Sequence, residues 1–175
     1  MTRTRIASLT LASIVAVALF YAVYLGLFAT MTVTEGVAGP FTFIYREMRG
    51  ADMSEVGAIT TALAQACDGA GITQRQPLDA FFPDGRAEIG FAVTSAPTDR
   101  LATLGPTRQR TLPARAAMLA DFPRRNRLSF IVGAAKVDRA FAEYRARHGY
   151  TKTEAYVLNT GDTIRYFQWT VAAAR

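Results

Sequence analysis

Hydrophobic and polar positions divide the chain into two unequal parts. Residues 6–30 carry no charged side chain and consist mainly of Ala, Val, Leu, Ile, Phe and Tyr. As a helix, this run reaches roughly 37 Å at about 1.5 Å per residue, enough to cross a hydrocarbon core of about 30 Å. The pattern therefore predicts a transmembrane anchor over residues 1–30 and a folded domain over residues 31–175.

The flanks of the apolar run predict its orientation. Arg3 and Arg5 precede it, whereas the first charge after it is Glu35. Since basic flanks stay on the cytoplasmic side, we expect a single-pass protein of a bacterial inner membrane with its N-terminus in the cytoplasm and its domain periplasmic or extracellular. The alternative is a cleaved signal peptide, whose apolar core spans only about 7 to 15 residues. The longer run favours an anchor, with the bilayer as its partner.

The rest of the chain repeats one pattern of elements. Aromatic and β-branched residues predict strands, apolar residues at helical spacing predict helices, and Gly-containing turns predict hairpins. The first half is expected to contain a strand, a helix and a hairpin at 40–46, 52–69, 78–82 and 88–94. The second half repeats this order at 110–122, 129–148, 153–158 and 163–171. Asp52 and Ser129 are the expected N-terminal caps of the two helices.

This repetition predicts the fold class. The two units span about residues 36–94 and 110–171, and Phe91-Ala92-Val93 matches Trp169-Thr170-Val171 at a separation of 78. Neither unit can bury its apolar face alone, so the two should pack together. We expect an α+β domain: a duplicated strand-helix-strand-strand unit with antiparallel sheets about a pseudo-two-fold axis, one helix per repeat, and a ligand cleft between the repeats.

Composition limits the chemistry. The formal net charge is +6, but the only basic cluster, residues 124–127, is interpreted as a solvated loop, so no nucleic-acid partner is predicted. Cys67 is the only cysteine and His148 the only histidine, which predicts no metal site and no cofactor. The chain has no G-x-S-x-G motif and no Gly-rich phosphate loop, so no catalytic residue is assigned.

Three short segments carry a family resemblance. They are Gly39-Pro40-Phe41, the run from Pro77 to Phe81 that leads to residues 89–93, and Glu154-Ala155-Tyr156. In this order the chain resembles the GyrI-like small-molecule-binding domains, which are also effector-binding modules of multidrug-responsive regulators. The resemblance implies a ligand between the two halves and an acid, here Glu154, facing an aromatic pocket that favours lipophilic cations. A predicted membrane anchor replaces the DNA-binding domain of those regulators.

Strand alternation places Glu154 and Tyr156 on one face. If Leu158 pairs with Thr163, Phe167 lies opposite Glu154, with Trp169 further along that face. A shift of one residue would present the other face of this strand instead. Without the resemblance, a surface contact between Glu154 and Arg165 would be the favoured interpretation of the acid; the resemblance favours the ligand-binding role instead.

The candidate ligand-binding residues are one acid and six aromatic side chains. They are Glu154, Tyr156, Phe167, Trp169, Tyr45, Phe81 and Phe91. The last three also suit an ordinary core. Asp79 is the proposed counterpart of Glu154 in the first half, either as a second acid in the cleft or as an exposed residue at a strand end.

These features together predict a membrane-anchored, extracytoplasmic protein that binds small lipophilic cations between its two halves. Two alternatives remain. One is a hydrolase of reactive small molecules that uses Glu154, and the other is a structural or partner-binding membrane protein without a ligand. The identity of a protein partner is left open.

Overall fold

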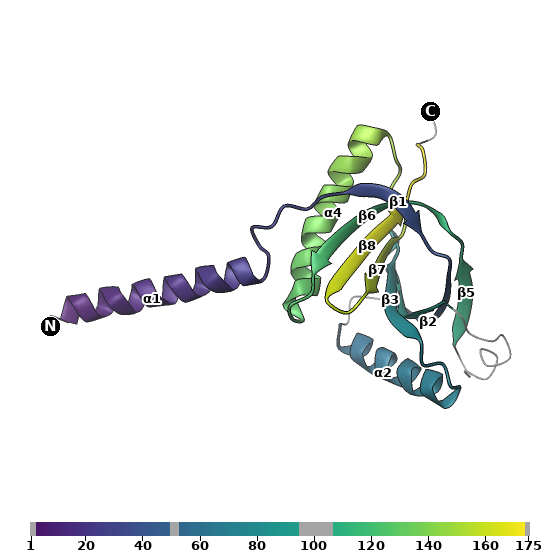
Figure 1. Ribbon diagram of the computed structural model, residues 1–175, viewed down its shortest axis with the longest axis horizontal. Helices are drawn as coiled ribbons and strands as arrows, with labels where there is room; N and C mark the ends of the chain where they lie inside the picture. The colour runs from purple at the N-terminus through teal and green to yellow at the C-terminus, as the bar shows by residue number, and fades with distance from the viewer. Residues whose placement is uncertain (1–2, 50–52, 95–106, 174–175) are drawn as a thin grey trace.

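Three helices and eight strands make up the part of the chain that the computed structural model describes, which is residues 3–49, 53–94 and 107–173 (Figure 1). In chain order they are α1 (Arg3–Tyr24), β1 (Thr34–Ala38), β2 (Phe41–Arg49), α2 (Met53–Gly69), β3 (Arg75–Phe81), β4 (Arg86–Val93), β5 (Arg108–Leu112), β6 (Arg115–Pro123), α4 (Leu128–His148), β7 (Ala155–Asn159) and β8 (Thr163–Trp169). The predicted α+β class is confirmed.

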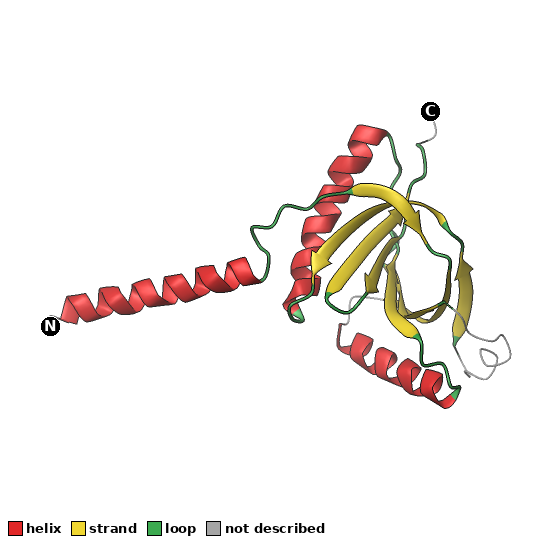
Figure 2. Ribbon diagram, viewed as in Figure 1, coloured by secondary structure: helices red, strands yellow, loops and turns green. Residues whose placement is uncertain are grey.

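All eight strands belong to one antiparallel sheet in the order β1-β6-β8-β7-β3-β4-β2-β5. The sheet curls into a half-barrel, and α2 and α4 lie on its outer side (Figure 2). Its other side is the concave face. Among the described helices none lies on the concave face, where strand side chains are gathered.

The two halves of the chain enter this sheet in corresponding positions. The first strand of each half pairs with the second strand of the other half, as β1 with β6 and β5 with β2. At the centre, β3 pairs with β7 through Leu78 and Leu158. The strand order is therefore the same from both ends once β1–β4 are exchanged with β5–β8. The expectation of two sheets is corrected: exchanged first strands and the central pair join both halves into one sheet.

Each half contains one strand more than the sequence analysis expected. Strand β1, with the sequence TEGVA, was missed because its Glu and Gly obscure any alternation of apolar residues. The expected strand 110–122 is two strands, β5 and β6, which are separated at Pro113. Proline cannot donate a hydrogen bond to a neighbouring strand, so the chain turns there.

The helix ends follow their sequence signals more closely. Helix α2 ends at Gly69 as expected, and Gly149 ends α4 in the left-handed conformation with φ +68. Ser129 was expected to cap α4, but it is the second residue of the helix. Its Oγ accepts hydrogen bonds from the backbone nitrogens of Arg125 and Asn126 at 3.0 and 3.2 Å. The predicted cap of α2 at Asp52 lies outside the described residues.

The outer face of the sheet holds two apolar cores, one beneath each helix. Under α2, Leu63 and Cys67 pack against strand residues that include Phe91. Under α4, Val137 and Phe141 pack against β6 and β8. Each large apolar side chain buried here contributes about 1.5 to 3 kcal/mol, so these cores fix the curvature of the sheet that the concave face depends on.

Helix α1 extends away from the half-barrel (Figure 1). It ends at Tyr24, before the uncharged run ends at Thr30, because Gly26 adopts φ +75 and the chain turns there. Within the described residues, no helix has the combined length and apolar character that a bilayer crossing requires.

Candidate functional site

Alternate residues of all eight strands form a largely aromatic cluster on the concave face. The buried members on this face are Ala38, Phe43, Tyr45, Leu78, Ala80, Ala92, Leu112, Ala117, Tyr156, Leu158, Phe167 and Trp169. Phe41, Phe82 and Leu119 lie against them and are partly buried. Because side chains alternate along a strand, this face also carries Glu154, two residues before Tyr156.

The pairing of β7 with β8 differs from the expected register by two residues. Leu158 pairs with Arg165 and Tyr156 with Phe167. A shift of two residues keeps the same face, since the side-chain period of a strand is two. Ala155 pairs with Gln168, so Trp169, rather than Phe167, lies next to Glu154 across the hairpin.

Three rings of this face form a compact aromatic group. Tyr156 and Phe167 are nearly parallel, with ring centroids 4.7 Å apart and planes 6° from parallel. Trp169 lies across both, at 5.5 Å from Tyr156 and 5.4 Å from Phe167. All three side chains are almost completely buried. They form a rigid apolar wall beside the acid.

Glu154 is half-buried at the edge of this group. Its Oε1 accepts a hydrogen bond from the hydroxyl of Tyr156 at 3.1 Å. The same hydroxyl accepts a hydrogen bond from Nη2 of Arg110 at 3.2 Å, and that nitrogen lies 2.7 Å from Oε2 of Glu88. A chain of carboxylate, phenol, guanidinium and carboxylate thus crosses the concave face.

Burial shifts the protonation of this chain of groups. It raises the pKa of Tyr156 to about 12; the carboxylate of Glu154 adds to this shift and the charge of Arg110 opposes it. Burial also raises the pKa of Glu88, against the lowering effects of Arg110 and Arg86. Tyr156 therefore remains a neutral donor to Glu154 at physiological pH.

The alternative of a surface contact between Glu154 and Arg165 is not observed. Arg165 instead forms two hydrogen bonds of 2.8 Å with Asp121 on β6. Among the described residues, no ion pair joins Glu154 to a basic side chain.

Arg110 fills the centre of the face in the first half. Its guanidinium carbon lies 5.5 to 5.9 Å from the centroids of four rings, which belong to Phe43, Tyr45, Phe82 and Tyr156. Of these residues, the sequence analysis named only Tyr45 and Tyr156. The period-two spacing of Phe43 and Tyr45 was a usable signal for the first of the missed rings.

Two of the expected site residues are not brought to the concave face. Phe81 is 40% exposed, and it alternates with Ala80 and Phe82, which do lie on that face. Phe91 is buried beneath α2 on the outer side. Neither is part of the candidate site.

The position of Phe91 follows from the pairing of the hairpins. Leu78 pairs with Gly90 in the first hairpin, and Tyr156 pairs with Phe167 in the second. Gly90, and not Phe91, is thus the counterpart of Phe167. The sequence comparison matched the final strands one residue out of step, which is enough to exchange the two faces.

Asp79 lies on the outer side as well. It is in the middle of β3, where its paired residues are Ile89 on β4 and Val157 on β7. Its Oδ1 accepts a weak hydrogen bond from the backbone nitrogen of Gly90 at 3.4 Å. It is therefore neither a second acid of the cleft nor an exposed residue at a strand end.

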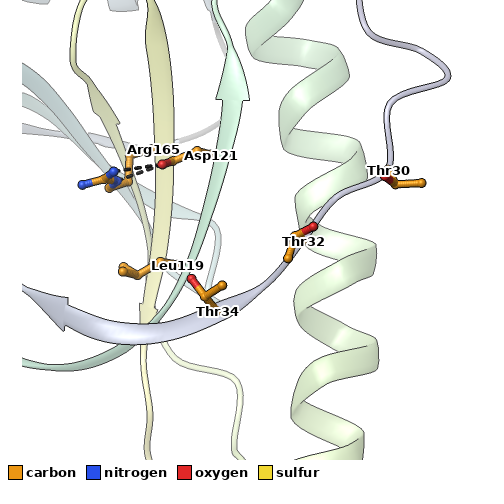
Figure 3. Close-up of a pocket in the computed structure, with 6 residues that line it drawn as sticks. All are labelled: Thr30, Thr32, Thr34, Leu119, Asp121 and Arg165. Carbon is orange, nitrogen blue, oxygen red and sulfur yellow. Dashed lines mark hydrogen bonds and ion pairs between the residues drawn. The ribbon is translucent and has the colours of Figure 1, made fainter.

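Two cavities are lined in part by residues of the concave face. One has a volume of about 330 Å³ and is lined by Thr30, Thr32, Thr34, Leu119, Asp121 and Arg165. Figure 3 shows Thr30 and Thr32 along the segment that leads into β1, Thr34 at the start of β1, and the hydrogen-bonded pair of Asp121 and Arg165 on the neighbouring strands. The other has a volume of about 310 Å³ and is lined by Phe41, Thr73, Gln74, Arg75, Gln76, Ala92 and Thr94. Glu154 lines neither of them.

The described residues hold no group of three or more His, Cys, Asp or Glu side chains that could bind a metal ion. His148 is engaged in ring stacking with Tyr144, at 3.9 Å between centroids. Cys67 is a residue of α2 and is buried in the core between this helix and the sheet. The chemistry that the concave face offers is therefore charge and aromatic surface.

Several solved structures share this fold. The curled sheet with two outer helices is shared with solved structures that include SAV2435 and the C-terminal domain of EcmrR. The C-terminal domain of EcmrR superposes with a TM-score of 0.59 and 11% identity, covering 82% of this chain and 99% of that domain. SAV2435 bound to tetraphenylphosphonium superposes with a TM-score of 0.54 and 12% identity, covering 80% and 94%.

A hydrolase from Listeria innocua shares the fold too, with a TM-score of 0.56 and 8% identity, covering 81% of this chain and 93% of that one. No protein-family model and no curated protein matches the sequence. At identities this low, the superpositions show a common fold.

Proposed function

We propose that this chain binds small lipophilic cations on its concave face, with Glu154 as the anionic partner of the ligand. The observation that carries the proposal is the position of this carboxylate. It lies half-buried at the edge of the Tyr156, Phe167 and Trp169 group, and its hydrogen-bond partner among the described side chains is a neutral phenol.

The physical chemistry of this position favours a cation with an apolar body. A carboxylate that has lost part of its hydration is stabilised when a positive charge approaches it. Aromatic rings attract the same charge through their faces by about 0.5 to 2 kcal/mol. An apolar body gains further free energy by covering those rings, at about 25 cal/mol per Å² removed from water.

The chain's own arginines support this preference. Arg110 lies among four rings, and the guanidinium carbon of Arg115 lies 5.6 Å from the ring centroid of Trp169. The concave face thus attracts positive groups from within the protein. SAV2435, which shares the fold, was solved with tetraphenylphosphonium, a cation of this chemical class.

Hydrolysis is the second candidate, since the Listeria innocua protein with this fold is described as a hydrolase. Glu154 could then act as a general base with Tyr156 as its hydrogen-bond donor. Product formation from a reactive small molecule would separate this activity from binding alone.

The test is a titration of the full chain with tetraphenylphosphonium, followed by the fluorescence of Trp169, the only tryptophan. We expect a saturable change in fluorescence, because the ring of Trp169 adjoins Glu154. Triphenylphosphine oxide, which presents similar rings without a charge, is the matched control and should bind at least tenfold more weakly. Equal binding of the two compounds, or no saturable change with either, would contradict the proposal.

A further inference from the structure

The guanidinium of Arg110 lies in a site built like a receptor for a cation. Phe43, Tyr45 and Tyr156 are buried side chains around it, and Phe82 is partly buried beside them. Nη2 of Arg110 lies 2.7 Å from Oε2 of Glu88, which is almost fully buried. Rings on several sides together with a carboxylate are the arrangement by which proteins bind guanidinium and quaternary ammonium groups. We call these four rings and Glu88 the cage.

Arg110 enters the cage from the edge of the sheet. Strand β5 pairs with β2 and is the last of the described strands at this end of the sheet. The hydrogen bond and the ion pair of the guanidinium both come from Nη2, and Nε is buried without a hydrogen-bond partner among the described residues. The long side chain of arginine can therefore leave the cage by rotation, without breaking a pair of central strands.

In the other half of the sheet, the counterpart of Arg110 is a glycine, Gly36. Gly36 of β1 pairs with Ala117 of β6, as Arg110 of β5 pairs with Phe43 of β2. Beside β1, the concave face has a cavity of about 330 Å³ lined in part by Thr34 and Leu119. At Gly36 itself, Cδ1 of Leu119 lies 2.7 Å from where a Cβ atom would be, so the sheet forms without a basic residue at this position.

We infer that the cage is a cation subsite and that Arg110 is its intramolecular occupant, in competition with a ligand cation. The inference rests on the proposed function and deepens it. The subsite adjoins Glu154, because Tyr156 contacts both Glu154 and Arg110. A ligand with one charge and several rings would displace Arg110, place its charge between Glu88 and Glu154, and spread its rings over the aromatic group. A ligand must therefore bind the cage strongly enough to displace Arg110, and weakly basic amines do not.

The first experiment tests the subsite without any lipophilic ligand. Replacing Arg110→Ala empties the cage, and we expect ethylguanidinium at low millimolar concentration to raise the melting temperature of this variant. The matched control is Arg108→Ala on the same strand, because Arg108 pairs with Glu47 and lies outside the four rings. Ethylguanidinium should leave this control and the unchanged protein without a shift.

The second experiment measures competition. Arg110→Ala should bind tetraphenylphosphonium at least tenfold more tightly than the unchanged protein, whereas Arg108→Ala, which removes the same charge, should change the affinity less than threefold. Should Arg110→Ala fail to fold, Arg110→Lys retains a charge for Glu88 but lacks the planar guanidinium that lies among the four rings, and it should still bind tetraphenylphosphonium more tightly than the unchanged protein.

The outcomes separate the two proposals. Rescue by ethylguanidinium without binding of tetraphenylphosphonium to any variant would support the cage and contradict the proposed ligand class. Binding of tetraphenylphosphonium that is equally tight in all variants, without rescue, would support the ligand class and overturn the role of Arg110. Identical responses of the Arg110 and Arg108 variants to both compounds would also overturn it.

Discussion

The hydroxyl of Tyr156 donates a hydrogen bond to Oε1 of Glu154 across 3.1 Å. Because burial raises the pKa of Tyr156 to about 12, this bond persists over the physiological pH range. It connects the acid to the aromatic group through a neutral side chain. The carboxyl group of Glu154 is therefore oriented by the hydroxyl of Tyr156.

Replacing Glu154→Gln keeps the shape of this side chain and removes its charge. We expect the affinity for tetraphenylphosphonium to fall by about 1.5 to 3 kcal/mol, roughly ten- to a hundredfold, which is typical of a lost hydrogen bond or contact with a charged group. Binding of triphenylphosphine oxide should change much less. Fluorescence titration of Trp169 provides the measurement.

The matched control for this variant is Glu143→Gln. Glu143 is an exposed acid on α4 that pairs with Arg139, so this variant loses the same charge away from the concave face. Its affinity should equal that of the unchanged protein. If the two variants bind the cation equally well, Glu154 is not the recognition acid.

Gly90 is predicted to be essential to the first half of the sheet. A Cβ atom at this position would lie 1.9 Å from the backbone oxygen of Ile44, so Gly90→Ala must push β2 and β4 apart. We expect a loss of at least about 2 kcal/mol in the free energy of unfolding, measured by urea denaturation. Gly57→Ala on α2 meets no atom within 4 Å and should stabilise the protein by about 0.5 to 1 kcal/mol. Equal effects of the two variants would refute the close approach.

Helix ends and turns that depend on nearby residues could be predicted from the sequence. The end of α2 shortly before Gly71, which has φ +70, and the hairpin turn at Gly85, which has φ +82, follow from the conformational freedom of glycine. The second hairpin was assigned too long a loop. Gly161 adopts φ +90, and the backbone nitrogen of Thr160 donates to the oxygen of Thr163, which closes a tighter turn and shifts the register by two residues.

The sequence predicts which face of a strand a residue lies on only where the pairing with the next strand can be derived from the hairpin between them. Glu154, Tyr156 and Trp169 lie together as expected because the shift of two residues keeps their face. Arg110 and Glu88 could not be placed. Their proximity depends on the pairing of β5 with β2 across the two halves, a contact between distant segments that no local pattern encodes.

The location of the domain outside the cytoplasm stays a prediction of the N-terminal charge pattern, with Arg3 and Arg5 before the apolar run. A reporter enzyme that is active only outside the cytoplasm, fused after Arg175, should be active. The same reporter fused to a chain that lacks residues 1–30 should be inactive. Activity of only the second fusion, or of neither, would refute this location.

Asp79 is predicted to make the stability of the fold depend on pH. Its carboxyl group lies on β3 between Ile89 and Val157, and burial raises its pKa from the ordinary value of 3.8 to about 7. Below pH 4 the group is protonated in both the folded and the unfolded chain. Between about pH 4 and 7 only the unfolded chain releases this proton, so the contribution of Asp79 to stability is present at low pH and is lost as pH rises.

Replacing Asp79→Asn removes this titration. The variant should therefore be more stable than the unchanged protein at pH 8, by about 1 to 3 kcal/mol, and the advantage should vanish near pH 4. Urea denaturation at several pH values measures the difference between the two proteins, which cancels the titration of the other carboxyl groups. Asp138→Asn, on an exposed position of α4, is the control and should show no such pH-dependent difference. A constant difference between pH 4 and 8 for Asp79→Asn would show that this carboxyl group titrates at its ordinary pKa in the folded protein.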